Sequence, residues 1–475
     1  MSGPSKAAII GGGVIGGGWA ARFLLNGWDV SIFDLDPEAE RKIGAVLENA
    51  RASLPQLYDQ KLPSEGALSF VNSIEEAVSG ADWVQESVPE RLDLKHGVLS
   101  EILAHSGDAI IGSSTSGFKP SELQEGASDP SRIMVAHPFN PVYLLPLIEL
   151  VPSPKTDRSV VERAKKILQS LGLKPLEVRS EIDAHIADRF LEAVWREALW
   201  LIKDDVATTE EIDDAIRFGF GLRWAQMGLF ETYRIAGGEA GMKHFIEQFG
   251  PCLSWPWTKL MDVPELTDEL IEKIATQSDA QSGMHSIREL ERIRDENLVV
   301  MMRALKARSW GAGQTITDHE RALPRPQNDD PAKPIDTISR VIPLDWGDYN
   351  GHMNESRYGQ VYSDAADAVL EHIGAAEDYI KSGFSFFTVD IHIQFLAETL
   401  VGQPIRVETT VLEGAGKKLK LLHRMLSEEG DVLSIGEQLL IHVSLETRRA
   451  CIPENGIAEQ LGKLAEQHET LRKNS

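Results

Sequence analysis

A glycine-rich turn near the start of the chain constrains the fold more than any other feature. Residues 7–10 form a short apolar run, AAII, and Gly11, Gly13 and Gly16 follow it at the start of a helical pattern, IGGGWAARFLLNG. In this setting the glycines allow a tight turn, a close approach of the backbone to a pyrophosphate, and close packing of helix on strand. The sequence therefore predicts a βαβ unit that binds a dinucleotide.

The residues around this turn favour NAD as the cofactor. Val14 and Ile15 complete the turn, and the pyrophosphate is expected at the N-terminus of the helix, where free amides favour negative charge. Asp34 ends the next apolar run, VSIFD, where a carboxylate can bond both ribose hydroxyls. Asp36 adds a second negative charge that would repel the 2′-phosphate of NADP. The alternative is a glycine turn that binds no ligand. The apolar strand before the turn, the helix after it and Asp34 together favour a dinucleotide site.

Composition limits the class of protein. The chain has 475 residues, of which 42% are hydrophobic and 25% charged, as in soluble globular proteins of two to four domains. The net charge of −25 argues against nucleic acid or an anionic membrane as a partner, because binding to phosphates requires clustered Lys and Arg. Cys252 and Cys451 have no CxxC spacing, which supports neither a disulfide framework nor a metal site. Without a signal peptide or a long apolar run, a cytoplasmic location is expected.

The first two thirds of the chain predict two domains. Residues 1–184 alternate short apolar runs with helical patterns, which is typical of an α/β Rossmann domain with a doubly wound parallel sheet. Residues 185–315 are helical in pattern throughout, and Thr208 with Glu211 forms a capping box. This pattern predicts an all-α second domain for substrate binding and dimerisation.

A proline-containing linker and a third domain follow the helical pattern. Between Gly311 and Ile335 prolines from Pro324 onward predict a linker, placed at 316–334, that sustains neither helix nor central strand. Residues 335–460 predict an α+β domain, with a helix over 355–374 followed by four strand-like runs, and 461–475 are predicted to be a C-terminal tail. The apolar face of the predicted helix contains Tyr358, Val361, Tyr362, Ala365 and Val369.

Residues 112–151 carry a resemblance to a known family. The run GSSTSGFKPSEL, followed by RIMVAHPFNPVYLLPLIELV, resembles the signature of the 3-hydroxyacyl-CoA dehydrogenase family, and the similarity covers about residues 6–310. The resemblance implies that Ser116 bonds the substrate hydroxyl, that His137 is the general base and that Glu149 orients His137. The run VPERLDLK similarly implies that Glu90 and Lys95 contact the nicotinamide ribose.

The chemistry of alcohol oxidation agrees with this assignment. Oxidation by NAD requires a base that takes the hydroxyl proton, and histidine has a suitable pKa near neutrality. A carboxylate on the other ring nitrogen fixes the tautomer and stabilises the imidazolium. For a lone histidine the alternative is a structural, hydrogen-bonded residue. Ser116 and Glu149 at the family's spacing favour a catalytic role for His137.

Two departures from the family pattern indicate a small cationic substrate. The run AHIADRF corresponds to a family stretch like GFIVNRL, so Asp188 replaces the asparagine that helps position substrate, and its carboxylate favours a cation nearby. The family's long helical insertion, which clasps the coenzyme A arm, is also missing, since only one helix and a short loop fit between Pro37 and Ser73. We therefore expect a free hydroxy acid.

One subgroup that the chain resembles, the L-carnitine dehydrogenases, meets both conditions, because carnitine is a β-hydroxy acid with a trimethylammonium group. The run RFGFGLRWAQMGLFE is similar to their helical domain. Aromatic faces hold quaternary ammonium groups, although core packing is the alternative for every aromatic residue. Arg223 is a candidate partner for the substrate carboxylate. The aromatic candidates are Phe139, Tyr143, Phe220, Trp224 and Phe230.

The second chemical signature is WGDYNGHMNESRY. It resembles the loop and helix start of hotdog-fold acyl-CoA thioesterases, and the similarity extends over about residues 336–452. Thioester hydrolysis needs a base-activated water or a carboxylate nucleophile, together with an amide dipole at the carbonyl oxygen. The resemblance makes Asp348 the candidate base or nucleophile, with Asn350 and His352 as polar partners and amides near Gly351 as the dipole. A hotdog module that binds coenzyme A or dimerises without turnover is the alternative.

The two resemblances together imply a pathway. Oxidised carnitine can be converted by another enzyme to betainyl-CoA, from which a thioesterase would release glycine betaine, so carnitine and betainyl-CoA are the expected substrates. A homodimer is expected by analogy with both families. The alternatives are a dehydrogenase of another 3-hydroxy acid, such as gulonate or 3-hydroxybutyryl-CoA, with a generic thioesterase, and a structural protein like the related lens crystallins. Intact Ser116, His137 and Glu149 argue against the latter.

Overall fold

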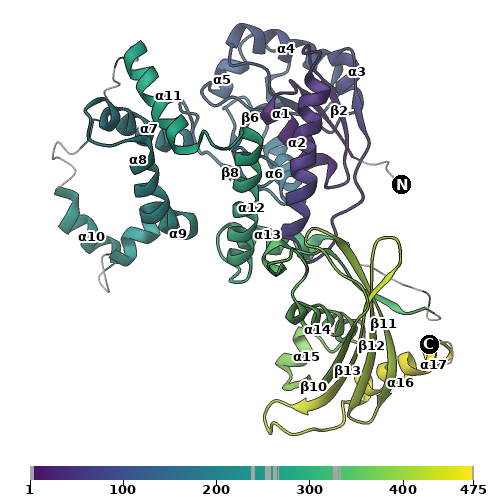
Figure 1. Ribbon diagram of the computed structural model, residues 1–475. Helices are drawn as coiled ribbons and strands as arrows, with labels where there is room; N and C mark the ends of the chain where they lie inside the picture. The colour runs from purple at the N-terminus through teal and green to yellow at the C-terminus, as the bar shows by residue number, and fades with distance from the viewer. Residues whose placement is uncertain are drawn as a thin grey trace. The chain divides into compact units, whose positions relative to one another are not determined.

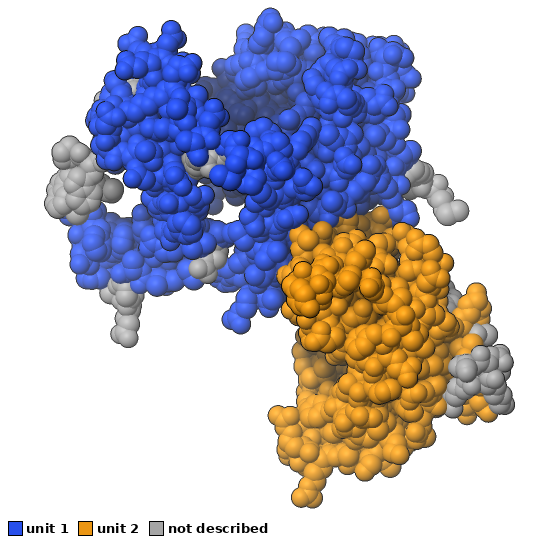
Figure 2. All heavy atoms as spheres, in the orientation of Figure 1, with its two compact units in different colours: residues 1–53, 64–321 blue, residues 54–63, 322–475 orange. Residues whose placement is uncertain are grey.

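The structure, a computed structural model, describes residues 5–236, 241–251, 258–259, 265, 267–324, 330 and 333–472. Cys252 and most of the proline-rich segment lie outside these ranges. The chain divides into two compact units, drawn in different colours in Figure 2. Unit 1 contains residues 1–53 and 64–321, and unit 2 contains residues 54–63 and 322–475. Among the described residues, no helix combines the length and apolar character needed to cross a membrane.

An eight-stranded sheet with the order β3-β2-β1-β4-β5-β6-β7-β8 forms the centre of unit 1 (Figure 1). All neighbouring strands are parallel except β6 and β7. The predicted Rossmann-like domain is confirmed. The strands are β1 (Lys6–Ile10), β2 (Asp29–Phe33), β3 (Leu68–Phe70), β4 (Trp83–Glu86), β5 (Ile110–Ser113), β6 (Ile133–Pro138), β7 (Leu147–Val151) and β8 (Lys174–Glu177).

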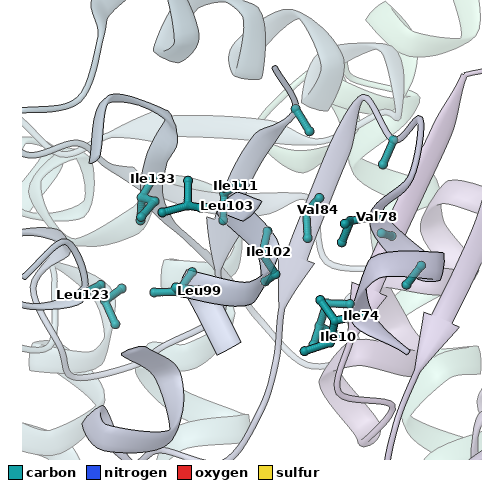
Figure 3. Close-up of a cluster of buried hydrophobic side chains, with 14 of the residues drawn as sticks. Ile10, Ile74, Val78, Val84, Leu99, Ile102, Leu103, Ile111, Leu123 and Ile133 are labelled. Carbon is teal, nitrogen blue, oxygen red and sulfur yellow. The ribbon is translucent and has the colours of Figure 1, made fainter. Parts of the chain in front are cut away.

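Apolar side chains from strands and helices form the core of this sheet. Ile10, Val84 and Ile111 of β1, β4 and β5 pack in one cluster with Ile102 of α4, and all four are essentially inaccessible to solvent (Figure 3). Burying one such side chain stabilises the fold by roughly 1.5–3 kcal/mol. The helices between the strands are α1 (Val14–Leu24), α2 (Ala39–Ser53), α3 (Ile74–Val78), α4 (Leu92–His105), α5 (Pro120–Leu123) and α6 (Arg158–Ser170).

The described residues of unit 1 from Ala187 onward are mainly helical, as predicted. The capping box at the start of α8 is confirmed, because the Glu211 amide donates to the Thr208 hydroxyl at 3.3 Å and the Glu211 carboxylate accepts from the Thr208 amide. The elements are α7 (Ala187–Lys203), α8 (Thr209–Ala215), η3 (Ile216–Phe220), α9 (Gly221–Ala236), α10 (Gly241–Phe249), α11 (Asp268–Ser282), α12 (Ile287–Lys306) and α13 (Ala312–Ala322).

Helix α13 contradicts one prediction. The stretch after Gly311 was predicted to sustain no helix, but the chain is helical from Ala312 to Ala322. The first proline of the segment is Pro324, so residues 312–322 contain no helix breaker. Ile316 and His319 are buried, which gives the helix an inner face.

Unit 2 contains a five-stranded antiparallel sheet with the order β10-β13-β12-β11-β9. The predicted helix is α14 (Glu355–His372), and its face with Val361, Tyr362 and Ala365 is buried against the sheet. The α+β plan is therefore confirmed. The strands are β9 (Ile335–Val341), β10 (Phe384–Phe395), β11 (Pro404–Ala415), β12 (Lys418–Leu426) and β13 (Val432–Ser444), and the other helices are α15 (Glu377–Lys381), α16 (Asn455–Gln467) and α17 (Glu469–Arg472).

Hydrogen bonds between buried side chains run across this sheet. Thr337 of β9 bonds Thr409 of β11 at 2.9 Å, and Thr409 bonds Nδ1 of His423 on β12 at 2.9 Å. On the other side of the ring, Nε2 of His423 bonds Gln438 of β13 at 3.0 Å, and the Gln438 amide donates to Thr388 of β10 at 2.7 Å. This polar chain contacts all five strands.

The predicted C-terminal tail is part of the core of unit 2. Helix α16 extends to Gln467, and its Leu461 and Leu464 pack in the same buried cluster as Val369 of α14. The prediction that a tail begins at residue 461 is therefore wrong, because α16 continues to Gln467. Its apolar residues recur at helical spacing and pack against the core of unit 2.

Ten residues from the N-terminal sequence also belong to unit 2. The segment Leu54–Pro63 begins with the short helix η1 (Leu54–Leu57) directly after α2. Arg340 of β9 is almost fully buried and forms ion pairs with Asp59 of this segment and with Asp364 of α14, the latter at 3.1 Å. The chain thus enters unit 2, returns to unit 1 and enters unit 2 again. No sequence pattern indicated this.

Candidate functional site

The glycine turn has the shape of a dinucleotide cradle. Gly11 follows β1 with φ +100°, and a Cβ there would lie 2.6 Å from the carbonyl oxygen of Ser87. A Cβ on Gly16 would lie 1.9 Å from the carbonyl oxygen of Gly11, whereas a Cβ on Gly13 would meet nothing within 4 Å. Positions 11 and 16 therefore require glycine. Gly13, at the start of α1, borders open space.

The predicted ribose acid lies against this turn. One oxygen of Asp34 accepts from the amide of Gly12, and the other accepts from the amide of Asp36 at 2.6 Å. Asp36 is paired with Lys42, whose ammonium lowers the pKa of that carboxyl. Lys42 balances the second charge, so the preference for NAD depends on Asp34. The glycine turn, the Asp34 carboxylate and the open space at Gly13 together fit bound NAD. Next to them, Val14 is exposed and Ile15 is half-buried.

The register of β6 and β7 brings His137 and Glu149 together. The two residues are direct partners across the antiparallel pair, and Nδ1 of His137 donates to Glu149 at 3.1 Å. Nδ1 is thus occupied by Glu149, and Nε2 is the ring nitrogen that this bond leaves unoccupied. Nε2 lies 3.6 Å from a carboxylate oxygen of Asp188. Both ring nitrogens therefore face an acid.

Glu149 also holds the beginning of α7. Its second oxygen accepts from the amides of Ile186 and Ala187 at 3.0 Å each. Burial raises the pKa of Glu149, but the bonds from His137 and the two amides outweigh it and keep the pKa below its ordinary value. Glu149 is therefore ionised. Because Asp188 lies in the first turn of α7, the Glu149 carboxylate positions both His137 and Asp188.

Asp188 has the opposite shift. Burial raises the pKa of its carboxyl and the Glu149 charge adds to this, while His137 acts against it. A carboxylate that is partly desolvated interacts strongly with a cation brought into the site. The geometry therefore suits a substrate with a positive charge.

The predicted nicotinamide residues are also close together. Lys95 is almost fully buried, and its Nζ lies 2.9 Å from Glu86 and 3.3 Å from Glu90. Glu90 accepts from the hydroxyl of Thr115 and from a nearby backbone amide. Thr115 precedes Ser116, which is exposed on the loop after β5. Glu86, at the end of β4, fixes Lys95 and was not predicted.

The aromatic candidates separate into two groups. The ring of Phe139 lies 5.2 Å from the ring of His137, so it borders the predicted base. Tyr143 is buried and donates its hydroxyl to Asp295 of α12 at 2.5 Å. Among the described residues no hydrogen bond, ion pair or ring contact links His137 to the remaining candidates. Of these, Trp224 packs on Phe220 at 4.6 Å, and Arg223 and Phe230 are exposed.

A buried histidine in this site was missed. His185, immediately before α7, is inaccessible to solvent, and its ring lies 5.5 Å from that of His137. Its Nε2 bonds the carbonyl oxygen of Thr115 at 3.2 Å. The family stretch GFIVNRL has phenylalanine at this position, so the comparison that revealed Asp188 contained a signal for His185 as well.

In unit 2 the predicted thioesterase residues form one tight turn. One oxygen of Asp348 accepts from the amides of Asn350 at 2.8 Å and His352 at 3.0 Å, and Gly351 has φ +79°. Desolvation raises the pKa of Asp348, but these amides outweigh it and hold the pKa below its usual value. Asp348 is thus an ionised carboxylate and a weak base. His352 lies 3.5 Å from Glu398, and Asn350 is exposed.

Three family models match the chain. Residues 6–182 match the NAD binding domain of 3-hydroxyacyl-CoA dehydrogenase, and residues 185–274 match the C-terminal domain of the same family. Residues 342–461 match the thioesterase-like superfamily.

Several relatives match along the whole chain or its first part. The L-carnitine dehydrogenase/betainyl-CoA thioesterase of Ruegeria pomeroyi is 66% identical, over 97% of this chain and 96% of that protein. The L-carnitine dehydrogenase of Pseudomonas putida is 51% identical, over 66% of this chain and 97% of that protein. The first two thirds of the chain thus correspond to a protein that occurs without the remainder.

A solved structure also resembles this first part. The NAD+-dependent 5-formyl-3-hydroxy-2-methylpyridine 4-carboxylic acid 5-dehydrogenase is 29% identical, with a TM-score of 0.55, and the match covers 64% of this chain and 99% of that one.

Proposed function

Because the chain belongs to the family of L-carnitine dehydrogenase/betainyl-CoA thioesterases, we propose that it catalyses both reactions of that name. Unit 1 oxidises L-carnitine to 3-dehydrocarnitine with NAD, and unit 2 hydrolyses betainyl-CoA to glycine betaine and coenzyme A. The observation that carries the first assignment is His137 between the carboxylates of Glu149 and Asp188. NAD and coenzyme A are cytoplasmic cofactors, and the enzyme is proposed to act in the cytoplasm.

In the proposed oxidation each residue has one task. Bound NAD supplies the hydride acceptor. His137 takes the hydroxyl proton on Nε2, and Glu149 on Nδ1 stabilises the resulting imidazolium. Ser116 bonds the substrate oxygen. Asp188 and the aromatic face of Phe139 attract the trimethylammonium group, which places the substrate carbon beside the base.

NADH absorbance tests this assignment directly. The purified chain is given NAD with L-carnitine, D-carnitine, gulonate or 3-hydroxybutyrate. L-carnitine is expected to be the preferred substrate, because it alone combines the oxidisable hydroxyl in the natural configuration with the cation. Protein that binds NAD but does not turn over L-carnitine would contradict the proposal.

For unit 2 we propose a hotdog fold, supported by the long helix α14 packed against an antiparallel sheet. We propose that the ionised carboxylate of Asp348 attacks the thioester carbon, that the coenzyme A thiolate leaves, and that water hydrolyses the resulting anhydride to glycine betaine and restores the carboxylate. Amides near Gly351 polarise the thioester carbonyl, with Asn350 and His352 as polar partners.

Betainyl-CoA hydrolysis by Asp348→Ala tests the nucleophile. Removal of an attacking carboxylate is expected to reduce kcat by at least about 100-fold. Asp345→Ala, which removes an exposed carboxylate from the same loop, is the matched control and is expected to retain activity. Wild-type rates in Asp348→Ala would reject the role of Asp348.

A homodimer is proposed for the whole enzyme. Strand β10 is an edge strand and exposes Phe387, Val389 and Phe395, and α7 exposes Phe190 and Trp195. Large exposed apolar surfaces on a sheet edge and a helix are typical of protein interfaces. Sedimentation equilibrium is expected to give twice the chain mass of 52.5 kDa.

A further inference from the structure

Two exposed side chains lie beside the predicted thioesterase turn and have no task in the hydrolysis proposed for it. Tyr349 directly follows Asp348, and 97% of its surface is exposed. Glu398, with 80% of its side chain exposed, lies 3.5 Å from Nε2 of His352, whose amide donates to Asp348. Among the described residues Glu398 has no lysine or arginine partner. A ligand at the turn can therefore contact both side chains.

Hydrogen bonds on both sides of Glu398 hold its segment in place. The carbonyl oxygen of Thr399 accepts from the amide of Met353 at 2.7 Å, and the Thr399 hydroxyl accepts from that of Tyr358 on α14 at 3.0 Å. On the other side, the amide of Ala397 donates to a carbonyl oxygen of β13 at 3.0 Å. The backbone at Glu398 is therefore fixed beside the turn, although the side chain itself is exposed.

The proposed substrate carries a group that suits these two side chains. In a betainyl thioester one methylene group separates the trimethylammonium nitrogen from the carbonyl carbon, so the cation lies close to the atom that Asp348 attacks. We propose that the Tyr349 ring and the Glu398 carboxylate bind this trimethylammonium group. The proposal rests on the proposed hydrolysis of betainyl-CoA. An aromatic face attracts a quaternary ammonium, which has no N–H bond to donate, and a carboxylate adds an attraction that weakens with ionic strength.

This pair would select the acyl group of the substrate. All acyl-CoA thioesters share the coenzyme A part, so only contacts with the acyl group distinguish one thioester from another. An uncharged acyl group gains no attraction from Glu398, and an anionic one is repelled by Glu398 and by Asp348. Tyr349 and Glu398 are thus specificity-determining residues next to the proposed nucleophile.

Hydrolysis of two thioesters of the same shape tests the proposal. Betainyl-CoA is compared with 3,3-dimethylbutyryl-CoA, in which a carbon atom replaces the charged nitrogen. The measured quantity is the ratio of kcat/KM for the charged thioester to kcat/KM for the neutral one. Because every variant acts on the same two compounds, their different intrinsic reactivity cancels when the ratios of two variants are compared.

Three variants of the full chain separate charge from aromatic contact. Glu398→Gln and Tyr349→Leu are each expected to lower the ratio about fivefold, as a contact with a solvent-exposed cation allows. The effect of Glu398→Gln is expected to decrease at high ionic strength. Tyr349→Phe retains the aromatic face and is expected to retain the wild-type ratio.

Glu446→Gln is the matched control. It removes an exposed carboxylate from the turn after β13, which the register of β10 and β13 places at Phe384. Glu398 follows the opposite end of β10, at Phe395. The control is therefore expected to show the wild-type ratio at every ionic strength.

Three outcomes would overturn the proposal while the proposed hydrolysis stands. The first is an unchanged ratio in Glu398→Gln or in Tyr349→Leu. The second is an equal loss of activity with both thioesters in these variants, which would show that the side chains support the turn and do not recognise the cation. The third is a Tyr349→Phe protein with a ratio as low as that of Tyr349→Leu, which would assign the effect to the hydroxyl. Wild type that does not hydrolyse betainyl-CoA would overturn the proposed function as well.

Discussion

Glu149 organises more of the dehydrogenase site than its assigned role requires. Its two oxygens receive three donors, the His137 ring and the amides of Ile186 and Ala187. The orientation of the His137 ring and the start of α7 therefore depend on the same buried charge. The family resemblance predicted the first of these bonds. The other two arise because the backbone of residues 186–187 lies against Glu149 of β7, a contact that no local pattern shows.

The raised pKa of Asp188 predicts a pH-dependent choice of substrate. As the pH falls toward this pKa, Asp188 becomes neutral and no longer attracts the trimethylammonium group. The ratio of kcat/KM for L-carnitine to that for 3-hydroxybutyrate is expected to decrease with falling pH. Because both substrates use His137 as the base, the ratio cancels the titration of the base itself.

Asp188→Asn is the matched variant for this measurement. Its ratio is expected to be low at every pH, since an amide carries no charge. A ratio in wild type that does not change with pH, or one that changes equally in Asp188→Asn, would show that Asp188 does not recognise the cation.

At the scale of elements, the polar chain across the sheet of unit 2 predicts acid sensitivity. Burial lowers the pKa of His423 from 6.5 to about 4, so below pH 6.5 the unfolded chain binds a proton that the folded chain does not. The contribution of His423 to stability is complete above pH 6.5 and is lost as the pH falls through about 4. Calorimetric melting of the full chain at a series of pH values measures this loss in the transition of unit 2.

Two variants separate His423 from other histidines. His423→Gln cannot take up the proton and is expected to flatten the decline between pH 6.5 and about 4. His372→Gln, which changes an exposed histidine at the end of α14, is expected to decline as wild type does. Equal slopes in wild type and His423→Gln would contradict the assignment.

The sequence predicted the strands that are buried on both faces, but not the short, mostly exposed strand or the helix next to the prolines. The strands β1, β4 and β5 are buried on both faces, so their apolar runs were distinctive. Strand β3 has only three residues, mostly exposed, and its pattern was too weak to predict. Helix α13 was not predicted, because the prolines that begin at Pro324 were taken to exclude helix from the whole segment after Gly311. At the site, the aligned motifs predicted His137 and Glu149 and contained a signal for His185, whereas Glu86 becomes visible only through its hydrogen bond to Lys95.

At the scale of the whole molecule, unit 2 depends on residues from the N-terminal sequence. Asp59→Ala is expected to reduce the stability of unit 2 by about 1–3 kcal/mol, because the buried Arg340 loses a carboxylate partner. Asp108→Ala is the control, since Asp108 is fully exposed and pairs loosely with Arg163 in unit 1. Calorimetric melting of both variants checks this. An unchanged transition of unit 2 in Asp59→Ala would show that the Asp59–Arg340 ion pair does not stabilise this unit.

The path of the chain also determines how the two catalysts can be separated. Because residues 54–63 belong to unit 2, the boundary between the units is not a single point in the gene. A protease that cuts once after α13 would release a C-terminal fragment whose missing ten residues remain in the other fragment. Splitting the gene there would produce the same pair of pieces, and only co-expression would bring all of unit 2 together. The two enzymes are therefore not interchangeable cassettes, and a transplant of the second one must include the loop after α2.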